Sequence, residues 1–224
     1  MKPHEFWQTI HPAGAFPEIG PHQGFYPARL KDGRQLRLPI RPLSDGVHAL
    51  ASLIINQASF EVIDVLAGQL ADELRGDDIE IIVGLPTLGL TLAAEVARKL
   101  GHARYVPCGN SRKFWYRDEL SVPISSITTP DQVKRLYLDP RMVPLIEGRR
   151  IALIDDVLSS GTSIAAGLAL LQKTGCEPVA IGAAMLQTRR WEEVLNALDA
   201  QWTSRVRGVL QTPFLRRVAN DAWM

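Results

Sequence analysis

The sequence has little cysteine and no strong excess of either charge. Its 224 residues include two cysteines, Cys108 and Cys176, which do not form a CxxC spacing, and five histidines that are scattered along the chain. A disulfide framework and a zinc site are therefore disfavoured. With 25 basic and 24 acidic residues, the formal net charge is +1, which argues against a dedicated nucleic-acid-binding protein.

A long apolar stretch is also missing. No run approaches the roughly 20 apolar residues that a membrane-spanning helix needs, and the chain does not open with the basic and then apolar segments of a signal peptide. We therefore expect a cytoplasmic protein without a membrane or a nucleic acid as partner. The length suits one large domain, with or without a small accessory region, and lets about 70% of the unfolded surface be buried.

What is present is a patterned stretch over residues 150–171. Its apolar residues 151–154 predict a strand that is buried on both faces, and we expect this strand to end at two carboxylates, Asp155 and Asp156. A hydroxyl-rich turn follows, and then an apolar helical segment that should end at Gly175. The turn consists of Ser159, Ser160, Gly161, Thr162 and Ser163.

This order suits a ligand with a phosphate at one end and hydroxyl groups beside it. Unpaired amides at a helix start favour a phosphate, and Gly161 lets the backbone approach closely while the neighbouring hydroxyls add donors. Asp155 and Asp156 would repel the phosphate, but they can bind sugar hydroxyls or lie near Mg²⁺. A ribose 5-phosphate satisfies both halves. Each residue by itself also fits an ordinary strand end and a capped helix.

Alternating strands and helices predict an α/β fold with a mostly parallel twisted sheet flanked by helices. Upstream of this core, an Asp-Gly turn between residues 25–30 and 35–40 predicts a hairpin, in which Pro27 and Pro39 indicate edge strands. Residues 45–75 have a helical pattern, in one piece or in two with Ser59 as a second N-cap. Core strands are expected at 79–85, 104–108, 133–138, 151–154 and 178–186, and core helices at 88–100 and 190–198.

The stretch from Ile151 to Ser163 closely resembles the signature of the type I phosphoribosyltransferases that binds 5-phosphoribosyl-1-pyrophosphate (PRPP). The signature has four apolar, two acidic and two mostly apolar residues, and then a loop rich in Ser, Thr and Gly. The resemblance is clear over about residues 79–186. It implies transfer of the phosphoribosyl group of PRPP to a nucleobase with release of pyrophosphate, Mg²⁺ as cofactor, and a homodimer.

The resemblance also implies three parts and a role for each site residue. Residues 1–45 would form an irregular segment and hairpin, a candidate for the hood that selects the base, 46–190 the core, and 191–224 a C-terminal helix and a tail that could add to the hood. Asp155 and Asp156 would act in catalysis by holding the ribose hydroxyls, near a Mg²⁺ ion carried by PRPP. The 5-phosphate would be bound by Ser159, Ser160, Gly161, Thr162 and Ser163.

A second loop, between the predicted strand 79–85 and the helix after it, would bind the pyrophosphate. It consists of Pro86, Thr87, Leu88 and Gly89, and the resemblance implies a cis peptide bond between Pro86 and Thr87. Relatives commonly have a basic or small polar residue where this chain has Leu88. A glycine-spaced turn of this kind is weak evidence taken alone, since a plain turn containing proline has the same pattern.

The aperiodic stretch from Gly109 to Asp131 is unusually long for a loop inside a compact domain and indicates a lid. Arg112 and Lys113, followed by aromatic residues, could close over the pyrophosphate and exclude water. We expect these two cations to act in catalysis. The alternative is a solvated surface loop whose aromatic residues pack against a neighbouring element or a second subunit.

The acceptor base is expected to be a purine, because the spacing of the loops looks most like that of adenine phosphoribosyltransferase. Hypoxanthine-guanine members of the family have an Asp at the position of Ser159, and serine cannot act as a strong base. Trp7, Phe25 and Trp223 are candidates for stacking on the base.

Two other functions fit parts of the pattern. One is a PRPP-sensing regulator on the same fold without transfer activity, and a nucleic-acid-binding regulator would need a basic surface. The other is a Mg²⁺-dependent phosphotransfer or receiver domain, but such proteins lack a Ser/Gly/Thr cradle after the acidic pair. The cluster that could supply the basic surface is Arg205, Arg207, Arg216 and Arg217.

Overall fold

A parallel sheet forms the core of the protein. The structure, a computed structural model, describes residues 2–124, 134–218 and 221–224. The core sheet has five parallel strands in the order β11-β10-β9-β5-β6. Their bounds are β5 (Ile81–Gly84), β6 (Val106–Pro107), β9 (Ile151–Leu158), β10 (Pro178–Gln187) and β11 (Val206–Thr212).

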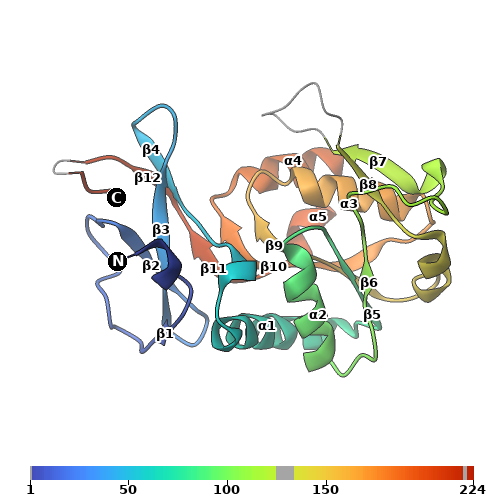
Figure 1. Cartoon of the computed structure of the whole chain (residues 1–224), viewed down its shortest axis with the longest axis horizontal. Coiled ribbons are helices and arrows are strands. Elements are labelled where there is room, and N and C mark those ends of the chain that lie inside the picture. Colours follow the sequence, from blue (N-terminus) through green and yellow to red (C-terminus); the bar gives the residue numbers. More distant parts are fainter. Residues whose placement is uncertain (1, 125–133, 219–220) are drawn as a thin grey trace.

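Helices cover both faces of the core sheet (Figure 1). Alternate residues of β9 point to opposite faces, so Ala152 and Ile154 pack with α1 and α2, whereas Ile151 and Leu153 pack with α3. All four side chains are fully buried, as expected for a central parallel strand. The helices are α1 (Phe60–Leu74), α2 (Gly89–Lys99), α3 (Thr162–Gln172), α4 (Arg190–Leu198) and α5 (Gln201–Ser204).

A second sheet of five strands stands beside the core sheet, and we call it the hood (Figure 1). Its antiparallel strands follow the order β1-β3-β4-β12, with β2 also paired to β3. The chain enters the hood at both ends, because β12 follows directly after core strand β11. The bounds are β1 (Ile10–His11), β2 (Phe25–Arg29), β3 (Gln35–Pro42), β4 (His48–Ala51) and β12 (Phe214–Arg216).

The remaining elements are short. Strands β7 (Ser121–Ile124) and β8 (Lys134–Tyr137) form a separate antiparallel ribbon, which packs against α3. Five 3-10 helices connect larger elements: η1 (Pro3–Glu5), η2 (Ile55–Gln57), η3 (Arg75–Asp77), η4 (Asp118–Leu120) and η5 (Pro140–Leu145). Among the residues that the structure describes, no helix has the length and apolar character needed to cross a membrane.

Several sequence predictions of local structure were wrong. The segment 45–58 is not α-helical, since it forms β4 and the short 3-10 helix η2. Ser59 does cap α1, because it accepts a hydrogen bond from the amide of Val62 at 3.2 Å. Pro39 does not lie on an edge strand, because β3 is paired on both sides. The strand predicted at 133–138 lies in the ribbon and not in the core sheet.

The predicted tail also contains regular structure. Its residues 206–212 and 214–216 form β11 and β12, one in each sheet, so both ends of the chain build the hood. The predicted division at residues 45 and 190 remains a prediction, but β4 continues the hood sheet beyond the first of these boundaries.

Candidate active site

The candidate site lies at the carboxyl edge of the core sheet, where parallel α/β sheets usually bind ligands. Strand β5 ends at Gly84, opposite Ile154, but β9 continues for four more residues, paired only with β10. The prediction that β9 ends at Asp155 was therefore wrong, because the partner strand supports it as far as Leu158. The acidic pair consequently lies inside a strand, on the side that β5 leaves open.

Asp155, which is buried, and Asp156, which is partly buried, form an acidic pair without an ion-pair partner among the described residues. The Asp155 side chain is largely buried, and its Oδ1 accepts a hydrogen bond from the amide of Asp156 at 2.9 Å. Burial raises the pKa of Asp155 well above its usual range, and the charge of Asp156 raises it further. Burial also raises the pKa of Asp156. Neither carboxylate forms an ion pair with any basic residue that the structure describes.

The start of α2 approaches this pair closely. A Cβ atom at Gly89 would lie 2.7 Å from Oδ1 of Asp155 and 2.9 Å from its Cα atom, so only glycine allows this approach. The peptide bond between Pro86 and Thr87 is cis, which confirms the sequence prediction. Leu88 is partly buried against the core cluster of α1 and α2, so its side chain serves packing, and this loop offers backbone amides rather than charge.

The hydroxyl-rich turn lies on the other side of the acidic pair. Gly161 has φ +83° as it enters α3, a conformation that glycine adopts without strain. The hydroxyls of Ser160 and Thr162 lie 3.0 Å apart. With Asp155, residues 157–164 line a small cavity of about 70 Å³, which exceeds the roughly 10–15 Å³ that one water needs. The predicted phosphate-binding residues are therefore brought together next to the acidic pair.

Helix α4 fixes the position of this turn. A Cβ atom at Gly161 would meet the Cα and carbonyl oxygen atoms of Trp191 at 3.2 Å. The indole of Trp191 donates a hydrogen bond to the carbonyl of Thr188 at 3.1 Å, which ties α4 to the end of β10. Nothing in the local sequence pattern indicates this contact, because it joins segments about 30 residues apart.

The described part of the predicted lid begins beside the second loop. Asn110, which the sequence reasoning missed, donates a hydrogen bond from Nδ2 to Oγ1 of Thr87 at 3.2 Å. Arg112 forms an ion pair with Asp118 at 3.4 Å. Lys113 is exposed, and among the described residues neither cation contacts residues 86–89 or the acidic pair. Residues 125–131 of the predicted lid lie outside the described residues.

An aromatic anchor holds this segment against η5. The indole of Trp115 donates a hydrogen bond to Asp139 at 3.0 Å, and the guanidinium of Arg141 stacks 4.5 Å from the Trp115 ring centroid. Hydrogen bonds from Arg141 hold the pKa of Asp139 far below its usual range. Because the Arg112–Asp118 pair is mostly solvated and contributes little stability, the anchor at Trp115 is the stronger connection.

Two of the three candidate stacking residues are unavailable to a base. Trp7 is 3% exposed and donates its indole hydrogen to the carbonyl of Ser52 at 2.9 Å. Trp223 is 8% exposed and packs with Ala49. Phe25 is partly buried and packs against the Phe16 ring, with 5.1 Å between centroids. The base-stacking role predicted for Trp7 and Trp223 was therefore wrong.

Most of the C-terminal arginine cluster is engaged in ion pairs. Arg205 pairs with Glu177 and Arg207 with Asp77, and Arg217 pairs with Asp221. Of the four residues, only Arg216 lacks an ion pair with a residue that the structure describes. The cluster therefore does not form the open basic surface that a nucleic-acid-binding regulator would need.

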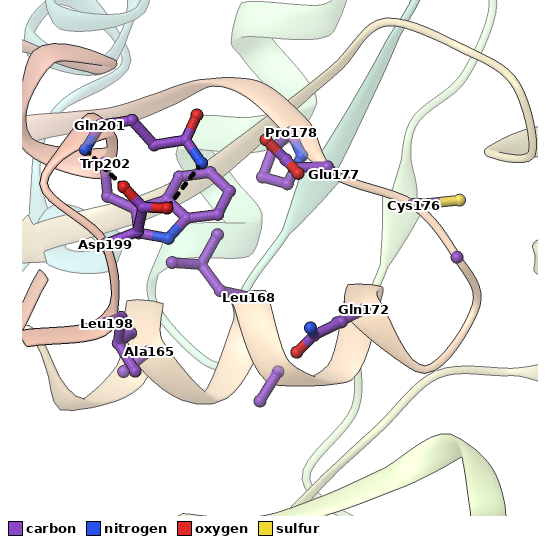
Figure 2. A pocket seen from close by; sticks show the side chains of 12 residues that line it. Ala165, Leu168, Gln172, Cys176, Glu177, Pro178, Leu198, Asp199, Gln201 and Trp202 are labelled. Atoms are coloured by element: carbon purple, nitrogen blue, oxygen red, sulfur yellow. Dashed lines mark hydrogen bonds between the residues drawn. The ribbon is translucent and has the colours of Figure 1, made fainter.

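A larger hollow, of about 360 Å³, lies away from the acidic pair between α3 and the α4–α5 segment (Figure 2). Its two acidic side chains are already paired. Both carboxylate oxygens of Asp199 accept hydrogen bonds from Gln201, at 2.9 and 3.1 Å, and Glu177 is paired with Arg205. The hollow therefore offers less unpaired chemistry than the smaller cavity at the sheet edge.

Comparisons with known proteins agree with this geometry. The model of the family described as phosphoribosyl transferase domain matches residues 50–203. A bifunctional protein PyrR of Streptomyces coelicolor is 32% identical over 135 residues, 59% of this chain and 65% of that protein. An adenine phosphoribosyltransferase of Alkaliphilus metalliredigens is 31% identical over 121 residues, 52% of this chain and 64% of that protein. This chain thus spans just under two thirds of the length of these relatives.

Solved structures show the same fold. The adenine phosphoribosyltransferase of Giardia lamblia, complexed with 9-deazaadenine, matches with a TM-score of 0.56 at 17% identity, over 68% of this chain and 80% of that one. The adenine phosphoribosyltransferase of Thermoanaerobacter pseudethanolicus matches with a TM-score of 0.52 at 20% identity, over 68% and 81%. The predicted α/β fold, with a mostly parallel sheet flanked by helices, is confirmed.

Proposed function

Because this chain belongs to the phosphoribosyltransferase family, we propose that it transfers the 5-phosphoribosyl group of PRPP to a purine-type base and releases pyrophosphate. One observation carries the proposal. One buried and one partly buried carboxylate, neither with an ion-pair partner among the described residues, lie between a hydroxyl-rich helix start and a loop of backbone amides. This arrangement suits a sugar diol with a phosphate on each side of it.

Each part of PRPP has a matching group in this site. The amides and hydroxyls of residues 159–163 would bind the 5-phosphate at the start of α3. Asp155 and Asp156 would accept hydrogen bonds from the two ribose hydroxyls. The amides of residues 87–89, at the positive end of α2, would meet the pyrophosphate. The lid cations Arg112 and Lys113 would approach it only after a movement, since neither contacts this loop in the structure.

The two carboxylates also fit a Mg²⁺ ion that is held mainly by the substrate. No group of three or more acidic, histidine or cysteine side chains in the described residues could hold a metal by itself. Mg²⁺, however, is usually bound through one or two carboxylates together with substrate phosphates and waters. When bound, the ion would neutralise charge that develops on the departing pyrophosphate.

The protein's own contribution is positioning and electrostatic stabilisation. As the bond at C1 of the ribose breaks, positive charge grows on the sugar ring, and the buried acidic pair lies where the ring hydroxyls would be held. The amides of the second loop would stabilise the negative leaving group. Ser159 cannot act as a strong base, so the acceptor nitrogen must reach the sugar with little help from that residue.

The finer features remain proposals. We expect a homodimer in which the lid region meets a partner subunit, and a cytoplasmic location. The alternative, a PRPP-sensing regulator without transfer activity, would keep the ligand site and lack turnover. The ion pairs of Arg205, Arg207 and Arg217 weigh against its nucleic-acid-binding form.

The test is a pyrophosphate-release assay with PRPP, Mg²⁺ and a panel of bases, on the wild type and on the double variant Asp155→Asn with Asp156→Asn. We expect wild-type turnover with at least one base and none in the double variant. A control double variant, Asp64→Asn with Asp72→Asn, removes the same charge from exposed positions of α1 and should retain turnover. Full turnover in the acidic-pair variant would refute the proposal, and thermal melting would verify that each variant folds.

A further inference from the structure

One face of the hood sheet carries aromatic and cationic side chains. Arg41, Leu50 and Phe214 lie opposite one another in a row across β3, β4 and β12. Because successive residues of a strand point to opposite faces, the next row, with Ala49 and Leu215, points the other way. Those two side chains are buried with Trp223, so the Phe214 row faces away from the interior of the hood.

The side chains around Phe214 are mostly cationic. The ring of His48 lies 4.7 Å from the Phe214 ring at an angle of 31°, and the guanidinium of Arg190, from α4, lies 5.8 Å from the same centroid. Arg216 is the register partner of His48. We call this set the hood face, and it comprises Arg41, His48, Leu50, Phe214 and Arg216 of the hood with Arg190 of α4.

The arginines of the hood face have unused donors. Arg41, Arg190 and Arg216 are exposed, and none of them forms an ion pair within the part of the chain that the structure describes. The carboxylate that contacts the hood face is that of Asp45, which is bound to His48 at 2.8 Å. The hood face therefore presents a flat apolar ring with hydrogen-bond donors around it and few free acceptors.

Two contacts place the hood face next to the candidate site. The side-chain Nε2 of Gln187, the last residue of β10, donates a hydrogen bond to the carbonyl of Ala51 at 2.6 Å, and Ala51 directly follows Leu50 in the chain. Gln187 lies four residues beyond Ala183, which pairs with Asp155. At the usual rise of a strand, Gln187 is therefore about 13 Å along β10 from the level of Asp155. On the other side, Arg190 precedes Trp191, which contacts Gly161 of the phosphate-binding turn.

We infer that the hood face binds the acceptor ring, and that the acceptor carries carbonyl or carboxylate oxygens at its edge, unlike an amino base such as adenine. This inference rests on the proposed function. Phe214 offers a flat apolar contact for the ring. The guanidinium groups of Arg41 and Arg190 can only donate hydrogen bonds, and they bind such oxygens strongly. An exocyclic amino group would instead meet further donors.

The test compares base preference in the wild type and in Arg190→Gln, Arg41→Gln and Phe214→Ala. The panel is adenine, hypoxanthine, guanine, xanthine, uracil and orotate, with PRPP binding measured separately by calorimetry. We expect the highest kcat/KM with an oxygen-bearing base. Arg190→Gln should lower this kcat/KM at least about tenfold by raising the KM for the base. The affinity for PRPP should change less than about twofold.

Two matched controls keep the result specific. Arg189→Gln removes a neighbouring arginine that is paired with Glu192 outside the hood face, and Phe60→Ala removes an exposed aromatic ring at the start of α1. Both should behave as the wild type. Preference for adenine, or an Arg190→Gln and an Arg41→Gln variant with unchanged base KM, would overturn the inference while leaving the proposed function intact.

The remaining outcomes also separate the two claims. A protein that neither binds PRPP nor turns over any base would overturn the proposed function, and the inference with it. If PRPP binds but no base in the panel reacts, the affinities of the product nucleotides are measured by calorimetry instead. Tighter binding of inosinate, xanthylate or orotidylate than of adenylate would support the inference, and tighter binding of adenylate would overturn it.

Discussion

Replacing Asp155 with asparagine is expected to stabilise the fold and, at the same time, to abolish PRPP-dependent turnover. The Asp155 side chain is 7% exposed and has a second carboxylate beside it. Asparagine has almost the same shape, and its Oδ1 can still accept the hydrogen bond from the amide of Asp156. The substitution therefore removes a buried charge without leaving a cavity, and the new Nδ2 donor can hydrogen-bond to the carboxylate of Asp156.

The expected gain follows from the raised pKa of Asp155. Below its ordinary pKa of 3.8, the carboxyl is protonated in both the folded and the unfolded chain, so Asp155 and asparagine should differ little. As pH rises, the unfolded chain loses its proton first, and wild-type stability falls until pH passes the higher pKa of the folded state. Each unit of difference between the two pKa values corresponds to about 1.4 kcal/mol.

We therefore expect Asp155→Asn to raise the free energy of unfolding at neutral pH by roughly 1–3 kcal/mol, as for other buried polar groups. For a chain of this size, each 1 kcal/mol raises Tm by about 2–4 °C. The measurement is thermal unfolding of the wild type and the variant across a pH series, together with pyrophosphate release. The advantage of the variant should grow from acidic to neutral pH, while its turnover falls to background.

Asp139→Asn provides a control with the opposite sign. Asp139 is similarly buried, at 8% exposure, but hydrogen bonds from Arg141 lower its pKa. Its removal should therefore destabilise the protein at neutral pH, and this loss should shrink as pH falls through the ordinary range of a carboxyl. If Asp155→Asn were instead less stable than the wild type at neutral pH, the buried acidic pair would have to be compensated in the folded state, and the reasoning would be refuted.

Two further substitutions test the surroundings of the acidic pair. Gly89→Ala should reduce kcat at least about 100-fold, because its Cβ would lie 2.7 Å from Oδ1 of Asp155 and would displace α2 from the site. The control is Gly182→Ala, whose Cβ would lie 2.6 Å from Cδ1 of Ile154 in the core. It should lose roughly 1–3 kcal/mol of stability and keep its turnover per folded molecule. Trp115→Phe removes the hydrogen bond to Asp139. It should therefore lower the free energy of unfolding by about 1 kcal/mol and raise the KM for PRPP several-fold. An unchanged KM would show that this anchor does not position the lid.

The sequence predicted the core of the site well, because the signals there are local. The apolar run of β9, the two carboxylates and the hydroxyl-rich turn are contiguous in the sequence. Their residue types predict, in that order, a buried strand, a polar sheet edge and a helix start. The cis bond between Pro86 and Thr87 was also predicted, although only through the family resemblance and not from any local pattern. The boundaries of α2 and α4 differ little from their predicted ranges.

The sequence failed where structure depends on pairing between distant segments. The alanines in residues 48–51 favoured a helix, but the segment becomes β4 because β3 and β12 pair with it on both sides. Strand β12 has three residues, which is too few for a periodic signal. Its position in the hood depends on where the chain leaves β11 and on its pairing with β4. Strand preference depends strongly on such context.

The hood illustrates why the proposed acceptor site was the least predictable part. Its face is assembled from β3 and β4 near one end of the chain, β12 near the other, and α4 of the core, so no single stretch of sequence contains the pattern. The aromatic residues that stood out in the sequence, Trp7 and Trp223, are large and apolar enough to be used as packing, whereas Phe214 remains 41% exposed beside Arg190.

The acidic pair shows how function and packing diverge in this fold. A fully buried strand would be more stable with apolar residues at positions 155 and 156, and the neighbouring Gly89 would be better replaced by a residue of higher helix propensity. Instead, neither carboxylate has an ion-pair partner among the described residues, and glycine stands where a Cβ atom would lie 2.7 Å from Oδ1 of Asp155. The preference for apolar residues in a buried strand and the preference for good helix formers in a helix are both violated at this sheet edge. Such violations are expected at a functional site. Hydroxyl donors or a cation would lower the energy of this arrangement, and the PRPP and Mg²⁺ of the proposed function would supply both.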